Sequence, residues 1–179
     1  MSKTLTQYDH ELNICRNLFL KKTQDYGTAW RILRATSLTD QLFIKARRIR
    51  QIEETQHQKI ADKIEDEYRG LINYSLMALI QLAAEKDLPV QLTGETALEL
   101  YNKNAEDVRR LMIEKNADYG EAWRDMRVSS FTDLILMKIL RIKQIEDNSG
   151  ATLVSEGISA NYHDIINYAI FALMKLNNI

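Results

Sequence analysis

The feature that most constrains this chain is an internal repeat. Residues 22–53 align without a gap on residues 115–146, and 17 of these 32 positions are identical. After one additional residue in the first copy the match resumes, so that Asn73 corresponds to Asn167 near the end of each copy. Shared helical composition does not produce this degree of self-identity over a contiguous stretch. The chain is therefore a tandem duplication of one unit.

Each copy predicts three helices, because apolar residues recur three to four positions apart. We expect them near 7–24, 38–55 and 60–83 in the first copy, and near 96–117, 131–147 and 158–177 in the second. The segment 85–95 holds the only proline, and Thr93 is a candidate N-cap there. The expected fold is all-α, a tandem duplication of a three-helix unit packed as a pseudo-two-fold helical bundle. Repeat 1 is assigned to 1–84, the linker to 85–95 and repeat 2 to 96–179.

Charge and cysteine content limit the classes of partner. The 24 Lys and Arg residues and 25 Asp and Glu residues give a net charge of −1, which provides no overall field to attract a membrane or a nucleic acid. Nucleic-acid binding would require the cations to cluster on one face. The single cysteine, Cys15, suits a reducing compartment. With no signal-like stretch at the N-terminus and no long uncharged apolar run, we expect a cytoplasmic protein.

The first repeated motif is KTQDYGTAWR from Lys22, which recurs as KNADYGEAWR from Lys115. Gly27 and Gly120 are expected to end the first helix or to form the turn after it. A structural interpretation makes the tryptophans core anchors, which we favour for these two residues, and pairs Arg with Asp. A functional interpretation stacks a base on the aromatic face and holds phosphate with the cations. The candidate residues are Lys22, Asp25, Trp30, Arg31, Lys115, Asp118, Trp123 and Arg124.

The second repeated motif has the pattern S-x-T-D-x4-K-x-x-R-I-x-Q-I-E. A lysine and an arginine three positions apart share one side of a helix, so both can reach one polyanion, and two such pairs facing each other would bind a triphosphate. The alternative is a solvated face. Asp40 and Asp133 are predicted to be capping residues, since Ser-x-x-Asp resembles a capping box. The candidate cations are Lys45, Arg48, Lys138 and Arg141.

The third helix of each copy carries a buried-type asparagine, Asn73 or Asn167. An amide on an apolar face needs partners, so each is either a packing clamp or a ligand contact. Asp164, with Glu156 two turns before it, could present carboxylate oxygens to Mg²⁺. Gly70 replaces Asp164 in repeat 1, so this metal site is predicted only for repeat 2, unless Asp66 or Glu67 substitutes.

Together these motifs resemble the nucleotide modification associated domain family, over nearly the whole chain. The resemblance implies a link to nucleotide modification or metabolism and no established chemistry. The final helix from Asp164 also looks like the last helix of all-α nucleoside triphosphate pyrophosphatases, which hold Mg²⁺ with clustered Glu and Asp residues. That resemblance extends to the metal site only at Asp164 and Glu156, because the helix that should carry paired glutamates carries Lys138 and Arg141 instead.

The sequence therefore predicts a nucleotide-binding protein, with pyrophosphatase-like hydrolysis as its candidate activity. In this hypothesis Asp164 and Asp118 are catalytic, Asp164 and Glu156 bind Mg²⁺, and Asn167 and the cations contact substrate. The partner is a nucleotide or modified nucleotide, and a homodimer is a further expectation. The alternative is a non-catalytic helical binding or interaction module whose repeated polar residues only lock helix packing.

Overall fold

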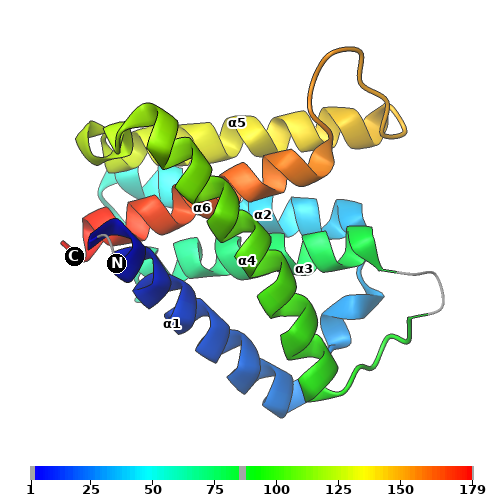
Figure 1. Ribbon diagram of the computed structural model, residues 1–179. Coiled ribbons are helices and arrows are strands. Elements are labelled where there is room, and N and C mark those ends of the chain that lie inside the picture. Colours follow the sequence, from blue (N-terminus) through cyan, green and yellow to red (C-terminus); the bar gives the residue numbers. More distant parts are fainter. Residues whose placement is uncertain (1–2, 85–87, 179) are drawn as a thin grey trace.

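Figure 1 shows the computed structural model of the chain, which describes residues 3–84 and 88–178. Within these residues there are six α-helices, two short 3-10 helices and no strand. In chain order they are α1 (Lys3–Tyr26), η1 (Ala29–Ile32), α2 (Ala35–Thr55), α3 (Ile64–Ala83), α4 (Gly94–Tyr119), η2 (Ala122–Asp125), α5 (Val128–Asp147) and α6 (Ile158–Leu176). The all-α duplication predicted from the sequence is confirmed.

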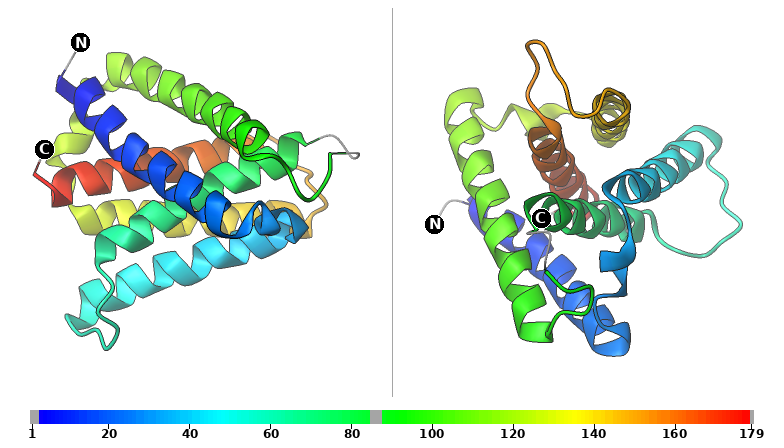
Figure 2. Two further views of the ribbon diagram at one scale, coloured as in Figure 1. Left: turned by 90° about the horizontal axis from the view of Figure 1, so that it is seen from below. Right: turned by 90° about the vertical axis from the view of Figure 1, so that its right-hand side faces the viewer.

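Four helices form the centre of the molecule. Helix α2 packs on α3 and α5 packs on α6, while contacts of α2 with α5 and of α3 with α6 join the two repeats. Helices α1 and α4 lie diagonally across this layer and contact α3, α6 and each other (Figures 1 and 2). The buried apolar side chains of both repeats belong to one hydrophobic cluster. The duplicated units therefore share a single core.

Buried polar contacts between the repeats come in symmetric pairs. Tyr162 and Glu146 of repeat 2 both hydrogen-bond the hydroxyl of Thr39, at 2.7 and 2.8 Å. The equivalent residues make the same contacts from repeat 1 to repeat 2. Tyr68 and Glu53 both hydrogen-bond the hydroxyl of Thr132, at 2.7 and 2.9 Å. Each repeat thus completes the hydrogen bonds of the other, which gives the bundle its approximate two-fold axis.

Helices α1 and α4 make a second symmetric pair of contacts. The hydroxyl of Tyr8 donates to Asn167 Oδ1 over 2.7 Å, and that of Tyr101 donates to Asn73 Oδ1 over 2.9 Å. Both bonds cross from one repeat to the third helix of the other. Burial of both donors and acceptors makes these bonds part of the core rather than of the surface.

The turn predictions are confirmed at three positions. Gly27 and Gly120 have φ values of 64° and 61°, the left-handed conformation that glycine adopts without steric cost. Their amides donate to Thr23 and Asn116 and so close the last turns of α1 and α4. Thr93 caps α4, because its hydroxyl accepts the amide of Thr96 over 3.1 Å.

The capping prediction for the second helix was wrong. Helices α2 and α5 begin three residues earlier than expected, after Arg34 and Arg127, which provide no side-chain cap. Asp40 and Asp133 therefore lie more than one turn inside their helices. Asp40 instead pairs with Lys143, and Asp133 lies 3.6 Å from the Arg50 guanidinium. These equivalent ion pairs link α2 to α5, so both aspartates are partners between the repeats.

None of the helices in the described part of the chain combines the length and apolar character needed to cross a bilayer.

Candidate functional site

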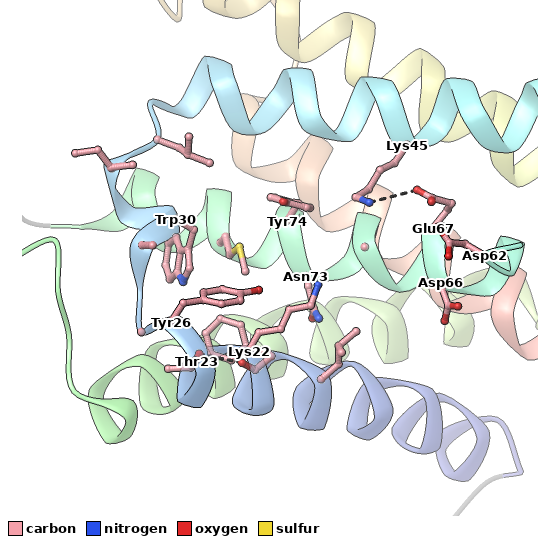
Figure 3. Close-up of a pocket in the computed structure, with 18 residues that line it drawn as sticks. Lys22, Thr23, Tyr26, Trp30, Lys45, Asp62, Asp66, Glu67, Asn73 and Tyr74 are labelled. Atoms are coloured by element: carbon pink, nitrogen blue, oxygen red, sulfur yellow. Dashed lines mark hydrogen bonds and ion pairs between the residues drawn. The ribbon is translucent and has the colours of Figure 1, made fainter. Parts of the chain in front are cut away.

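Each repeat has a cavity beside the turn after its first helix, which contains the sequence DYG, residues 25–27 in repeat 1 and 118–120 in repeat 2. We call these turns the DYG turns and the two cavities the DYG cavities. The repeat 1 cavity encloses about 690 Å³ between α1, η1, α2 and α3 (Figure 3). The repeat 2 cavity, at the equivalent place between α4, η2 and α6, encloses about 320 Å³. Equivalent residues line both: Lys22, Tyr26, Trp30, Asn73 and Tyr74 in repeat 1, and Lys115, Tyr119, Trp123, Asn167 and Tyr168 in repeat 2. The duplication thus preserved a cavity as well as a core.

The turn after α1 fixes the aromatic wall of the repeat 1 cavity. The chain reverses at Gly27, and the 3-10 helix that follows turns Trp30 inward until only 9% of it is exposed. The buried hydroxyl of Thr28 donates to Val90 O over 2.8 Å and accepts from the amide of Leu92, which ties the turn to the segment before α4. Tyr26, at the end of α1, remains 58% exposed beside the cavity.

The indole nitrogens are unusual for buried tryptophans. Trp30 Nε1 and Trp123 Nε1 are both buried, and neither has a hydrogen-bond partner among the described residues. A buried donor without a partner costs about 1–3 kcal/mol. The prediction that both residues are core anchors holds for their rings, because both belong to the core cluster. Both residues also line a cavity.

In repeat 1 the cations and carboxylates share the cavity. Lys45 Nζ lies 3.3 Å from Glu67 and 5.7 Å from the centre of the Tyr74 ring. Arg48 also pairs with Glu67, from outside the residues that line the cavity. In Figure 3 the aromatic side chains occupy one end and Glu67 lies toward the other. Lys22 is exposed at the cavity and forms no ion pair with any described residue.

In repeat 2 a carboxylate occupies the position between the two lysines. Asp164 accepts from Lys115 Nζ and Lys138 Nζ, both at 2.6 Å, while its side chain is only 8% exposed. Burial disfavours the charged form of Asp164, but the hydrogen bonds from the two lysines outweigh it and hold its pKa below the usual value. Burial likewise opposes the charge on Lys115, and the bond to Asp164 raises its pKa despite this. Asp164 therefore balances one of the two lysine charges and holds both ammonium groups, of which Lys115 lines this cavity and Lys138 lies on the other side of the carboxylate.

The repeat 1 residue that is equivalent to Asp164 is Gly70. A Cβ atom there would lie 2.8 Å from Cδ and from Cε of Lys45, so the Lys45 side chain lies directly over the glycine. Glu67, one turn earlier on α3, takes over the role of lysine partner that Asp164 has in repeat 2.

The two asparagines have different sets of partners. Asn73 donates to Cys15 O over 3.1 Å and accepts from Tyr101, so it is a packing clamp. Asn167 accepts from Tyr8, but its Nδ2 is buried without a partner among the described residues. It combines a clamp with one free donor that borders the repeat 2 cavity.

The arginines of the DYG motif lie outside both cavities. Arg31 donates to Leu88 O over 2.9 Å and to Pro89 O over 3.3 Å, and it also binds Gln81. Arg124 donates to residues near the start of α1: Thr4 over 2.6 Å and Gln7 over 2.8 Å. Both arginines hold the turn to a neighbouring segment, so their role is structural, but the predicted pairing of Arg with Asp was wrong because these long side chains reach other partners first.

The remaining candidates are not brought to the DYG cavities. Asp25 and Asp118 are exposed, and neither lines either DYG cavity. Lys138, Arg141 and Glu156 line another depression, beside the loop between α5 and α6. Each DYG cavity takes its lining from its own repeat, so the cation pairs of α2 and α5 do not face each other across either one.

Comparison with family models identifies the domain. The model described as nucleotide modification associated domain 1 matches residues 22–82 and 115–176. The chain belongs to this family. The two matches contain the DYG turn, the cation-bearing helix and the asparagine-bearing helix of each repeat, so each DYG cavity is built largely within one family domain. No curated protein and no solved structure matches the chain.

The donor set at Asp164 does not fit a resident Mg²⁺ ion. Lysine ammonium groups hold both carboxylate oxygens, and Glu156 lines a different depression. Across residues 3–84 and 88–178, no three His, Cys, Asp or Glu side chains are close enough together to hold a metal. Magnesium binding stays a prediction for which the nucleotide itself would have to supply ligands.

Sequence reasoning missed two contributors to the cavities, Tyr26 and Tyr74, and named Glu67 only as a possible substitute for Asp164 at a metal site. The tyrosines are identical in the second copy, as Tyr119 and Tyr168, and this identity was the available signal. Repeat identity gave no signal for Glu67 as a lysine partner, because its equivalent, Asn161, is uncharged. Its role follows only from the crossing of α2 and α3.

Proposed function

We propose that the protein binds a nucleotide in the repeat 1 cavity, with the base against Trp30 and Tyr26 and the phosphate at Lys22 and Lys45. The observation that carries this proposal is one cavity that combines a buried indole N–H lacking a partner with two lysine side chains. Membership of a nucleotide modification associated family agrees with this ligand class.

The size and chemistry of the cavity support a ligand with a planar end and an anionic end. Its volume of about 690 Å³ lies within the range of small-molecule sites. Stacking on an aromatic ring contributes about 1–3 kcal/mol per base. The Trp30 N–H would donate to a base acceptor, and Lys22 would donate to a phosphate oxygen in a charge-assisted hydrogen bond.

Neutralisation of Glu67 does not depend on Lys45 alone. Arg48 pairs with the same carboxylate, so Lys45 can turn to a phosphate while Glu67 keeps a cationic partner. This arrangement differs from repeat 2, where Asp164 has only Lys115 and Lys138 as ion-pair partners among the described residues.

Pyrophosphatase-like hydrolysis of the bound nucleotide is the more specific proposal. Mg²⁺ commonly uses one or two protein carboxylates together with substrate phosphates and water. Asp62 and Asp66 line the end of the repeat 1 cavity away from Trp30 and would be the candidate carboxylates for a metal nucleotide, because Glu67 is paired with Lys45 and Arg48 (Figure 3). Binding is the function that the geometry supports best, because it requires only groups already in place.

The rival proposal is a non-catalytic interaction module. It draws support from Arg31, Arg124, Asp40 and Asp133, repeated polar residues whose contacts lie within the protein. This proposal expects no nucleotide to stabilise the protein.

Thermal shift and calorimetric titration with the common nucleoside triphosphates, with and without Mg²⁺, test the proposed function. A ligand at one hundred times its Kd stabilises the folded state by about 2.7 kcal/mol. We expect Lys22→Ala to weaken binding about tenfold, because it removes one charge-assisted contact. Lys21→Ala is the matched control, since Lys21 is exposed and lines no cavity. Equal effects of the two variants, or no nucleotide binding at all, would refute the site.

Chromatography of the same mixtures tests hydrolysis. Release of nucleoside monophosphate and pyrophosphate only in the presence of Mg²⁺ would support pyrophosphatase-like hydrolysis. Intact triphosphate after prolonged incubation would restrict the function to binding.

A further inference from the structure

The repeat 2 cavity keeps the aromatic wall of repeat 1 but not its open cation site. Lys115, Tyr119, Trp123 and Tyr168 occupy the places of their repeat 1 counterparts. Asp164 holds both Lys115 and Lys138 at 2.6 Å, the distance of a strong charge-assisted bond. A carboxylate of the protein thus stands where repeat 1 can receive a phosphate.

Two buried donors remain without partners in this cavity. Trp123 Nε1 and Asn167 Nδ2 find no acceptor among the described residues, and the residues that carry them are 7% and 5% exposed. Both residues line the cavity. The repeat 1 cavity has one such donor on its lining, Trp30 Nε1, because Asn73 donates to Cys15 O.

The Trp123 ring offers its edge rather than an open face. Phe171 stacks on it with ring centres 4.4 Å apart and planes at 4°, and the Arg124 guanidinium lies over it at 4.4 Å. In repeat 1 Met77 takes the place of Phe171, and Arg31 is held on the linker. A ligand of repeat 2 would therefore find its stacking surface on Tyr119, which is 74% exposed, and would reach the buried Trp123 N–H only by a shift of side chains.

We propose that the repeat 2 cavity is a second binding site, which takes an unphosphorylated nucleoside in place of a nucleotide. Its two unpartnered donors would bind acceptors on the edge of the base, while Asp164 fills the phosphate position. The class of ligand, a nucleoside, rests on the proposed function of the protein. The prediction that this ligand carries no phosphate rests on the position of Asp164.

Charge and volume both favour this ligand. Repulsion from the Asp164 carboxylate, about 4 kcal/mol per unit charge at 4 Å and an effective dielectric of 20, offsets the attraction of one of its two lysines, and a phosphate would have to break a hydrogen bond of Asp164 to reach either ammonium group. The cavity volume of about 320 Å³ is less than half that of repeat 1. An uncharged nucleoside avoids the repulsion and needs less space than a triphosphate.

The two tryptophans provide one reporter for each cavity. The chain has only Trp30 and Trp123, so a ¹H–¹⁵N spectrum contains two indole signals, and Trp30→Phe assigns them. The full-length protein is titrated with the four common ribonucleosides and, separately, with their 5′-monophosphates. We expect a nucleoside to shift the Trp123 signal, and a monophosphate to shift the Trp30 signal and leave Trp123 in place.

Asp164→Asn tests the cause of the selectivity, because it frees both lysines while keeping the side-chain shape. We expect the monophosphates to shift the Trp123 signal in this variant, with affinity for that cavity raised at least about tenfold. Asp147→Asn, an equal change of charge at an exposed residue that lines neither cavity, should leave both patterns unchanged.

The outcomes separate the two proposals. If no nucleoside moves the Trp123 signal, or if monophosphates move it as strongly in the wild-type protein, the second site is refuted. If Trp30 fails to respond to every nucleotide, the proposed function fails, whatever happens at Trp123. The wild-type comparison stands even if Asp164→Asn does not fold.

Discussion

A carboxylate at position 70 would give repeat 1 the residue that repeat 2 carries at Asp164. In Gly70→Asp the new Cβ displaces Lys45, whose Cδ and Cε lie 2.8 Å from that position. The added carboxylate then lies among the cavity cations, Lys22 and Lys45. We expect it to pair with them, as Asp164 pairs with its two lysines, and to close the site to phosphate.

The magnitude follows from two opposing effects. Repulsion between the new carboxylate and one phosphate charge at 4 Å is about 4 kcal/mol at an effective dielectric of 20. Neutralisation by the two lysines removes roughly half of this, so about 2 kcal/mol remains, equivalent to a loss of affinity of about thirtyfold. Folding stability should fall by less than about 1 kcal/mol, since replacing a helical glycine offsets part of the cost of moving Lys45.

Calorimetric titration with the best nucleotide from the screen measures the affinity, and urea denaturation measures the stability. Gly70→Ala is the control, because it adds the same Cβ without a charge and should lose much less affinity than Gly70→Asp. Equal losses in both variants would assign the effect to displacement of Lys45 and refute the electrostatic argument. Unchanged affinity in both would place the nucleotide outside this cavity.

Two further predictions concern the contacts between the repeats. Burial raises the pKa of Glu53 and of Glu146, so folding favours their protonated forms; this contribution is fully present below the unfolded pKa near 4.5 and is lost as pH rises through the higher folded values. The double variant Glu53→Gln with Glu146→Gln should therefore unfold at a higher temperature than the wild type at pH 7. Its thermal midpoint should also fall less steeply as pH rises above 4.5, and an equally steep fall in the variant would show that these two carboxyl groups do not cause the pH dependence. Tyr8→Phe and Tyr101→Phe each leave a buried amide oxygen without its donor and should each cost about 1–3 kcal/mol by urea denaturation. Markedly unequal losses would show that the symmetric bonds are not energetically equivalent.

The sequence by itself determined the duplication, the helical class and the turns. These features depend on local spacing: apolar residues three to four positions apart predict helices, and Gly27 and Gly120 mark the left-handed residues that follow α1 and α4. The repeated motifs were also sufficient to indicate the family. They located the DYG turn as the region around which each cavity forms.

The helix boundaries and the roles of the repeated acids required the tertiary structure. Asp40 and Asp133 have the spacing of caps but lie inside their helices and join the repeats. Capping statistics describe the first turn of one helix and contain no information about which helix packs opposite. Retention in both copies is therefore compatible with either role until the packing of α2 on α5 is known.

Only the tertiary structure decided which side chain meets which in the cavities. The sequence identified Asp164 as a metal ligand, and folding brings it to Lys115 and Lys138 across gaps of 49 and 26 positions in the chain. It marked Arg31 and Arg124 as phosphate contacts, whereas folding turns them to the linker and to α1. The physical reason is that long side chains reach whatever the crossing of the helices places within a few ångströms, and that crossing depends on the packing of the whole core.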